Sequence, residues 1–153
     1  MAKSVRRSRR RMALVFLLAA VLVSSGIAIT PAHAGTGLRG QMVPLINDDR
    51  ADRDRPALKL DLELSRYARK HSQDMADAGE LFHTSDLAAK LKGKSWSIGG
   101  ENVGMGPSLP DLEDMFMAST PHRRNILNRK FDHVAVGVVE SDGIFWVTVI
   151  FYG

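Results

Sequence analysis

The chain has 153 residues, with 21 Lys and Arg against 17 Asp and Glu, and it contains no cysteine. Its length suits a single domain, and the lack of cysteine excludes a disulfide framework, a thiolate zinc site and a cysteine nucleophile. The basic excess is local, because residues 1–34 hold six basic residues and no acidic one. Residues 35–153 therefore carry 15 basic and 17 acidic side chains, a net charge of −2, which argues against nucleic acid as a partner.

Residues 1–34 have the pattern of a secretory signal peptide. A cationic start ends at Arg11, an apolar run covers residues 12–29, and small residues occupy positions −3 and −1 if cleavage follows Ala34. The run is just long enough to span a bilayer, but polar and glycine residues dilute its second half, so we predict cleavage rather than a retained anchor. Arginine pairs near the start leave the export route, general or twin-arginine, open.

This pattern predicts three parts: a signal peptide (1–34), a short glycine-rich lead-in (35–40) and one folded domain (41–153). We expect a secreted protein, extracellular or in the cell-envelope space, with no stable membrane span after cleavage.

Two helices are predicted in the first half of the domain. The first covers residues 42–52, and charges of alternating sign over residues 48–55 indicate a solvated face and a loop. The second begins at the N-cap Asp61 and ends at Gly79, with an apolar stripe at helical spacing. The stripe consists of Leu64, Ala68, His71 and Met75. Its histidine is interpreted as a hydrogen-bonded core residue.

The middle of the domain is predicted to be less regular. Ser85 is the predicted cap of a short third helix that ends near Leu91. Residues 94–108 are expected to form a loop that leads into a short buried strand, and a further helix starts around Pro110.

The C-terminus is predicted to be a hairpin. Residues 134–139 and 144–152 are rich in β-branched and aromatic side chains, and residues 141–143 supply a turn. Both strands are apolar on both faces, which implies a sheet covered by helices on two sides. The predicted fold class is therefore α+β, as an α–β–α sandwich.

Three polar residues stand out from this scaffold. His83 precedes a predicted helix cap, Glu101 lies in a glycine-rich stretch where a backbone can approach a ligand closely, and His122 lies just beyond a predicted helix. Taken singly, each has an ordinary explanation: an exposed loop histidine without a role, or a carboxylate that caps backbone N–H groups.

Taken together and in order, the motifs of this chain resemble the bacterial branch of the CAP superfamily, also called SCP-like domains. Residues 47–50 resemble the family's opening Asn-x-x-Arg helix. The resemblance continues through residues 68–76, 82–85, 100–102, 119–127 and 131–137, and ordered matches cover nearly all of residues 41–153.

The resemblance implies an α–β–α sandwich with a central antiparallel sheet and a shallow cavity lined by two histidines and acidic residues. The matching positions are His83, Glu101 and His122, with Asn102 and Ser119 as orienting neighbours. Two imidazoles and a carboxylate form a ligand set acceptable to zinc. The expected cofactor is a divalent metal ion, zinc or calcium, and the histidines are the metal-binding candidates.

The chain departs from the family pattern at several positions. Phe116 stands where a tryptophan is usual, Pro121 where glycine is common, and Thr148 where a glutamine is frequent. The second acidic cavity residue has no clear counterpart, and the candidates are Asp111, Glu113 and Asp114.

Three functions fit these residues. The first is a secreted binding module whose cavity holds a metal ion, a lipid, a sterol-like molecule or another envelope-derived ligand. The second is a metal-dependent hydrolase, peptidase-like, that uses the same cavity. The third is a structural or partner-binding envelope protein in which the polar trio has no role. We favour the binding module, because neither a His-Glu-x-x-His helix nor a Gly-x-Ser-x-Gly elbow is present.

Overall fold

The computed structural model describes residues 37–153. The predicted signal peptide and the first two residues of the predicted lead-in lie outside the described residues. In chain order the elements are α1 (Arg39–Ala51), β1 (Lys59–Leu60), α2 (Leu62–Ala78), α3 (Leu87–Lys90), β2 (Gly99–Gly106), α4 (Leu109–Ala118), α5 (Thr120–Ile126), β3 (His133–Ser141) and β4 (Ile144–Tyr152).

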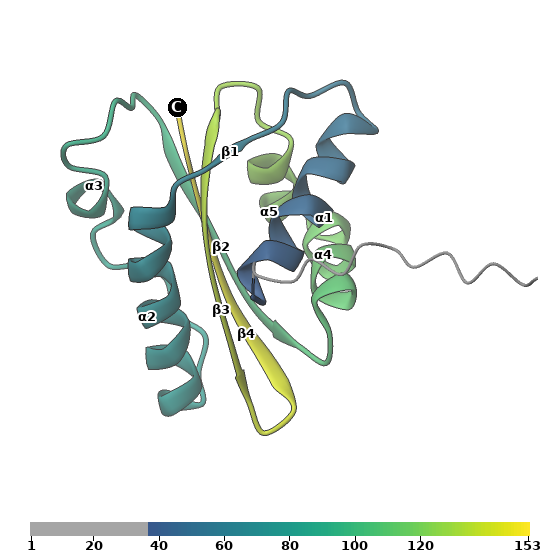
Figure 1. Ribbon diagram of the computed structural model, residues 1–153, viewed down its shortest axis with the longest axis vertical. Helices are drawn as coiled ribbons and strands as arrows, with labels where there is room; N and C mark the ends of the chain where they lie inside the picture. Colours follow the sequence, from purple (N-terminus) through teal and green to yellow (C-terminus); the bar gives the residue numbers. More distant parts are fainter. Residues whose placement is uncertain (1–36) are drawn as a thin grey trace, which may run out of the picture. The chain divides into compact units, whose positions relative to one another are not determined.

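The elements form three layers around one sheet. Figure 1 shows α2 and α3 on one side of the strands and α1, α4 and α5 on the other. The strand order is β1-β3-β4-β2. The predicted sandwich and the α+β class are confirmed. The sheet is mixed rather than purely antiparallel, because the two-residue β1 pairs in parallel with the start of β3.

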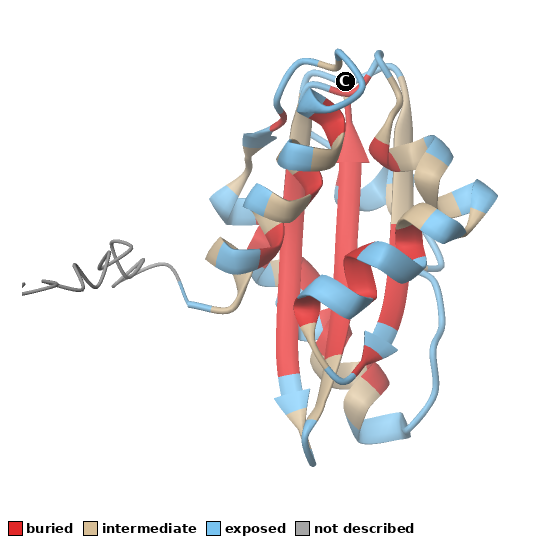
Figure 2. Ribbon diagram, turned by 90° about the vertical axis from the view of Figure 1, so that its right-hand side faces the viewer, coloured by how far each residue is buried: buried red, intermediate tan, exposed pale blue. Residues whose placement is uncertain are grey.

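The C-terminal hairpin forms as the sequence predicts. Ser141 pairs with Ile144, so the loop has two residues, Asp142 and Gly143. Both have positive φ, 52° and 75°, which is the combination that a type I′ turn requires and that matches the twist of the flanking strands. Figure 2 shows that the long strands are buried along most of their length, as a sheet covered on both faces must be.

Helix α2 is capped and buried as predicted. The Asp61 side chain accepts a hydrogen bond from the Leu64 backbone N–H at 3.0 Å, and Gly79 ends the helix in the left-handed conformation, with φ 66°. The helix lies directly on β3, since a Cβ on Gly137 would come within 2.1 Å of the Ala68 carbonyl carbon. A glycine is therefore needed at this crossing.

The charged segment at residues 48–55 differs from its prediction, because one of its arginines is fully buried. The Arg50 side chain has no exposed surface, and it donates hydrogen bonds to backbone carbonyls at distances of 2.6–3.3 Å. The acceptors belong to Pro56, Ile126, Asn128 and Phe131. A guanidinium has enough donors to satisfy several carbonyls at once, so this arginine joins α1 to two loops instead of facing solvent.

Element boundaries also differ from the predicted ones. Helix α1 begins at Arg39, inside the predicted lead-in, rather than at residue 42. The cap of α3 is Asp86 rather than Ser85, because the Asp86 carboxylate accepts from the Ala89 backbone N–H at 2.9 Å. Within residues 37–153, no helix is both long and apolar enough to cross a bilayer.

Candidate functional site

Glu101 anchors the loop that carries His83. The loop follows α2, and Glu101 lies on β2. One oxygen of the Glu101 carboxylate is 2.7 Å from His83 Nδ1 and accepts from the Thr84 backbone N–H at 2.9 Å. The other oxygen accepts from the Thr84 hydroxyl at 2.5 Å. These bonds hold the loop against the strand, because Glu101 is a nearly buried acceptor whose two oxygens are both satisfied.

The contact with Glu101 orients the His83 ring. A carboxylate can only accept, so Nδ1 of His83 donates to it, and Nε2 is the ring nitrogen that Glu101 leaves free. The His83 side chain is 62% exposed, whereas that of Glu101 is 5% exposed. His83 therefore presents Nε2 to the surface, while the contact with Glu101 holds the ring in place.

The glycines before Glu101 have a packing role and do not form a ligand-binding loop. They lie in β2, an eight-residue strand, where the sequence predicted a loop leading into a short strand. A Cβ on Gly100 would lie 2.9 Å from Asn125 Oδ1 and 3.1 Å from the Phe131 ring. Glycine at this position lets α5 and the following loop pack closely against β2.

His122 belongs to α5 itself, not to a loop beyond a helix as predicted. Asn102, which has no exposed surface, donates to the His122 carbonyl at 3.2 Å. Asn125 donates to the Asn102 side-chain oxygen at 2.9 Å and to the Glu101 carbonyl at 3.2 Å. These bonds fix α5 on β2, and Asn102 contacts His122 through its backbone carbonyl only.

The environment of His122 keeps its ring neutral. The ring packs edge-on against Phe116, with 5.0 Å between centroids. Burial lowers the pKa of His122, and the charge of His83 lowers it further. The ring is therefore uncharged at neutral pH and offers a lone pair.

Glu101 and Asn102, which contact His83 and the backbone of His122, are neighbours on β2. Successive side chains of a strand point to opposite faces, so the Glu101 carboxylate meets His83 on the α2 side of β2, and the Asn102 amide meets the backbone carbonyl of His122 on the α5 side. The His122 ring lies at the edge of β2, where it lines a cavity together with Leu81 and Val103. Among residues 37–153, no three His, Asp or Glu side chains are close enough together to hold a metal ion. The described side chains thus fall short of a preformed three-ligand metal site.

An apolar cavity of about 320 Å³ lies at the edge of β2 beside His122. It is lined by Leu81, Val103, Gly104, Met105, Leu112, Met115, Phe116, Ser119 and His122. Three of these apolar side chains, those of Leu81, Met105 and Met115, remain 39–55% exposed. The polar groups are confined to Ser119 and His122, so the cavity combines an apolar wall with one polar end.

None of the three acidic candidates lines this cavity. Asp111 accepts from the Ser108 hydroxyl at 2.6 Å at the start of α4, and Asp114 is exposed. Glu113 is 3% exposed and has no hydrogen-bond partner within the described part of the chain. Burial, with smaller contributions from Asp49 and Asp114, raises the pKa of Glu113 to about 8. Glu113 is a neutral core acid at neutral pH and not a cavity ligand.

His71 is the histidine that the sequence places in the core, and it is buried between α2 and β4. Its Nδ1 is 3.1 Å from the Thr148 hydroxyl, which also accepts from Ser72 at 2.9 Å. Its ring packs edge-on against Phe82 at 5.1 Å. Burial lowers the pKa of His71. Thr148, one of the departures from the family pattern, is thus part of a buried polar cluster between α2 and β4.

The exposed apolar residues of the cavity are what sequence reasoning missed. Leu81, Met105 and Met115 come from a loop, a strand and a helix, so no spacing in the sequence connects them. Their local signal is weak, since single exposed apolar residues are common on protein surfaces. Only the fold shows that they form one wall.

Comparisons with known proteins agree with this architecture. The CAP family, described as the cysteine-rich secretory protein family, matches residues 43–151. An uncharacterized protein of Bacillus subtilis is 37% identical over 112 residues, which cover 69% of this chain and 44% of that protein. The chain therefore spans less than half the length of this curated relative.

Two solved structures share the fold. One is an extracellular protein from Bacillus anthracis that contains an SCP domain, with a TM-score of 0.64 and 29% identity over 76% of this chain and 40% of that one. The other is an outer surface protein of Borrelia burgdorferi, with a TM-score of 0.66 and 18% identity over 74% of this chain and 90% of that one. The second likeness concerns the fold alone.

Proposed function

This chain belongs to the CAP family of cysteine-rich secretory proteins, and from that premise we propose that it is an extracellular binding module for a small apolar ligand with one polar group. The observation that carries the proposal is the cavity at the edge of β2, with its apolar wall and its single polar end at Ser119 and His122. A lipid, a sterol-like molecule or another envelope-derived compound has this chemistry.

The volume and lining of the cavity support such a ligand. About 320 Å³ is within the range of small-molecule sites. The exposed parts of Leu81, Met105 and Met115 would lose contact with water when an apolar ligand binds, which is favourable in proportion to the area covered. Methionine side chains adapt their shape, so the wall suits flexible apolar chains.

The polar end of the cavity would orient a bound ligand. The side chain of Ser119 makes no capping hydrogen bond to α5, so its hydroxyl is available to a ligand. The neutral ring of His122 offers a second partner. A carboxyl or hydroxyl head group would bind there, with the apolar part along the wall.

Two observations support an extracellular location for this protein. The Bacillus anthracis relative is described as an extracellular protein, and residues 1–34 have the pattern of a signal peptide. An apolar ligand from the cell envelope would be accessible to a protein in that location.

Metal binding by His83 and His122 is a separate prediction. Two observations support it: Nε2 of His83 is left free by the Glu101 contact, and burial lowers the pKa of His122. Each ring could then supply one ligand, and solvent or substrate would have to complete the set. No feature of residues 37–153 favours the hydrolase hypothesis over binding.

The test of the proposed function is a titration of the purified protein with a fluorescent fatty acid. We expect saturable binding in the wild type, and a loss of affinity of about tenfold in Met115→Glu, because a charge would then border the apolar wall. Leu62→Glu is the matched control, since Leu62 is 57% exposed and lies on α2, outside the cavity. Equal binding by both variants would disprove the assignment of the cavity.

A further inference from the structure

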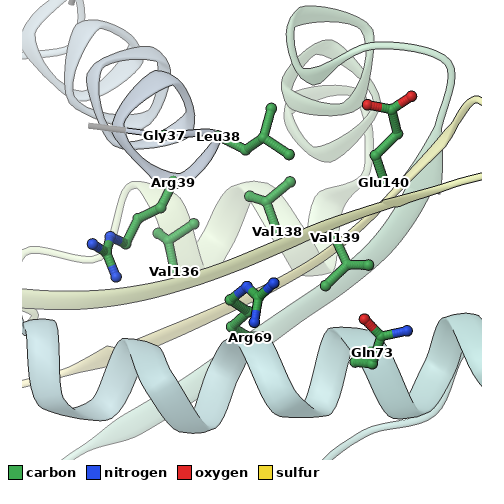
Figure 3. A pocket seen from close by; sticks show the side chains of 9 residues that line it. All are labelled: Gly37, Leu38, Arg39, Arg69, Gln73, Val136, Val138, Val139 and Glu140. Atoms are coloured by element: carbon green, nitrogen blue, oxygen red, sulfur yellow. The ribbon is translucent and has the colours of Figure 1, made fainter. Parts of the chain in front are cut away.

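A second groove, of about 490 Å³, lies at the opposite edge of the sheet (Figure 3). It follows the open side of β3 between the start of α1 and the middle of α2. Its lining residues are Gly37, Leu38, Arg39, Arg69, Gln73, Val136, Val138, Val139 and Glu140. The proposed function does not use this groove.

The backbone of β3 is unpaired along this groove. Strand β1 covers only His133 and Val134, whereas β3 continues to Ser141. The next edge-facing N–H, that of Val136, donates to the Ser65 hydroxyl at 3.1 Å. Backbone groups of alternate residues point to the same edge, so those of Val138 and Glu140 also face the groove.

Within residues 37–153, no other element donates to or accepts from these groups of Val138 and Glu140. Such an open edge is a template for another strand. The template is short, because β1 blocks one end and the hairpin turn limits the other.

Opposite charges stand at the two ends of the groove. Val136, Val138 and Glu140 share one face of β3, and Figure 3 shows Arg39 extending from α1 toward Val136 on that face. Neither Arg39 nor Glu140 forms an ion pair with another residue of the described part. Arg69 of α2 also lines the groove, so the groove carries two basic side chains and, at the Glu140 end, one acidic side chain.

We propose that the occupant of this groove is a second copy of the chain, which pairs its own β3 antiparallel to the first about a two-fold axis at Val139. The N–H and C=O of Val138 then bond to those of Glu140 in the other copy, and the symmetry repeats the pair. Glu140 of each copy lies opposite Val138 of the other and diagonal both to Val136, near Arg39, and to the second Glu140, so the two ion pairs with Arg39 must outweigh the repulsion between the Glu140 carboxylates.

A second copy is the preferred occupant because the charges of the groove are complementary to those of the same groove turned by a two-fold axis. An antiparallel two-fold arrangement brings the acidic end of each groove to the basic end of the other, and it forms both ion pairs at once. A register closer to β1 would drive the partner strand into the segment at Asp61, which bonds to Val134 at 2.8 Å. The pairing is thereby limited to residues 137–141.

Sedimentation velocity of the purified protein tests this proposal with a charge exchange. The wild type is expected to shift from monomer to dimer between micromolar and millimolar concentration, as suits a small interface. Arg39→Glu and Glu140→Arg should each weaken the dimer about tenfold or more, and the double variant should restore it. Arg124→Glu, on an exposed site of α5, is the matched control and should leave dimerisation unchanged.

Amide hydrogen exchange of the wild type gives a second measurement that needs no variant. The amides of Val138 and Glu140 should exchange more slowly as concentration rises. A monomer at every concentration, or a dimer that the charge variants do not weaken, would overturn the proposal. Amides that are protected independently of concentration would do so as well, because the groove would then be covered by the chain's own residues. Thermal unfolding of each variant verifies that it is folded.

Discussion

At the residue scale, Arg50 shows how a charged side chain serves as an internal connector. Its guanidinium replaces the water that four backbone carbonyls would otherwise bind. Burial, and then the charge of Arg55, lowers the pKa of Arg50, yet an arginine stays protonated at any ordinary pH. The α1 helix is thus joined to the loops before β1 and β3.

Replacement of this side chain should be costly. Arg50→Met leaves the carbonyls of Ile126 and Phe131 without a donor, and we expect a loss on the order of 3 kcal/mol or more in the free energy of unfolding. Urea denaturation measures it. Lys70→Met is the matched control, because the exposed Lys70–Asp74 pair contributes at most about 1 kcal/mol. Similar losses in both variants would contradict the connecting role of Arg50.

Glu113 should make stability depend on pH. Its pKa is about 8 in the folded protein, against an ordinary value of 4.5, so the folded state binds the proton more tightly. Stability is full below about pH 4.5 and falls as pH rises toward 8, by at most about 1.4 kcal/mol per pH unit.

Glu113→Gln should remove this loss, so the variant is more stable than the wild type at pH 8. Urea denaturation across this pH range is the measurement, and Asp114→Asn, at the exposed neighbouring position, is the control. If Glu113→Gln leaves the pH dependence of the wild type unchanged, Glu113 is not the titrating group.

At the scale of elements, α2, the helix that precedes the His83 loop, crosses β3 in close contact at Gly137. Gly137→Ala would place a methyl group inside the Ala68–Arg69 backbone, and the helix would have to move. We expect a destabilisation of at least about 2 kcal/mol, measured by thermal unfolding.

Gly106→Ala is the milder comparison for that prediction, since its Cβ would meet only the Leu112 side chain, at 3.1 Å. An unchanged melting temperature in Gly137→Ala would show that α2 does not lie on β3 as closely as the structure indicates.

The elements differ in how far the sequence predicts them. Helix α2 and the C-terminal hairpin carry local signals, a capped apolar stripe and an Asp-Gly turn, so their prediction is confirmed. Strand β1 has only two residues and exists through its pairing with β3. Strand β2 is rich in glycine, and its extended shape depends on β4. Neither has a pattern of its own, because tertiary pairing determines both.

The candidate site was predictable only in part for the same reason. His83, Glu101 and His122 belong to motifs that resemble a family, and the structure confirms a contact between His83 and Glu101. That these residues form a functional site stays a prediction. The apolar wall comes from three elements that only the fold brings together, and Asp111, Glu113 and Asp114 prove to lie outside it.

At the scale of the whole molecule, the two edges of the sheet have different chemistry. The β2 edge carries the apolar cavity beside His122, and the β3 edge carries the groove between Arg39 and Glu140. The helical layers between them are closely packed around the sheet. The proposed ligand site and the proposed self-association surface therefore lie at different edges, and variants at one edge should not alter the behaviour of the other.

The most direct test of the central claim is methionine methyl NMR of the protein during titration with a medium-chain fatty acid. Met105 and Met115 line the cavity, whereas Met42 and Met75 are fully buried in the core and serve as internal controls. Ligand binding in the proposed cavity predicts saturable shifts of the first pair and unchanged signals from the second. Saturable binding that leaves Met105 and Met115 unshifted, or no binding at all, would contradict it.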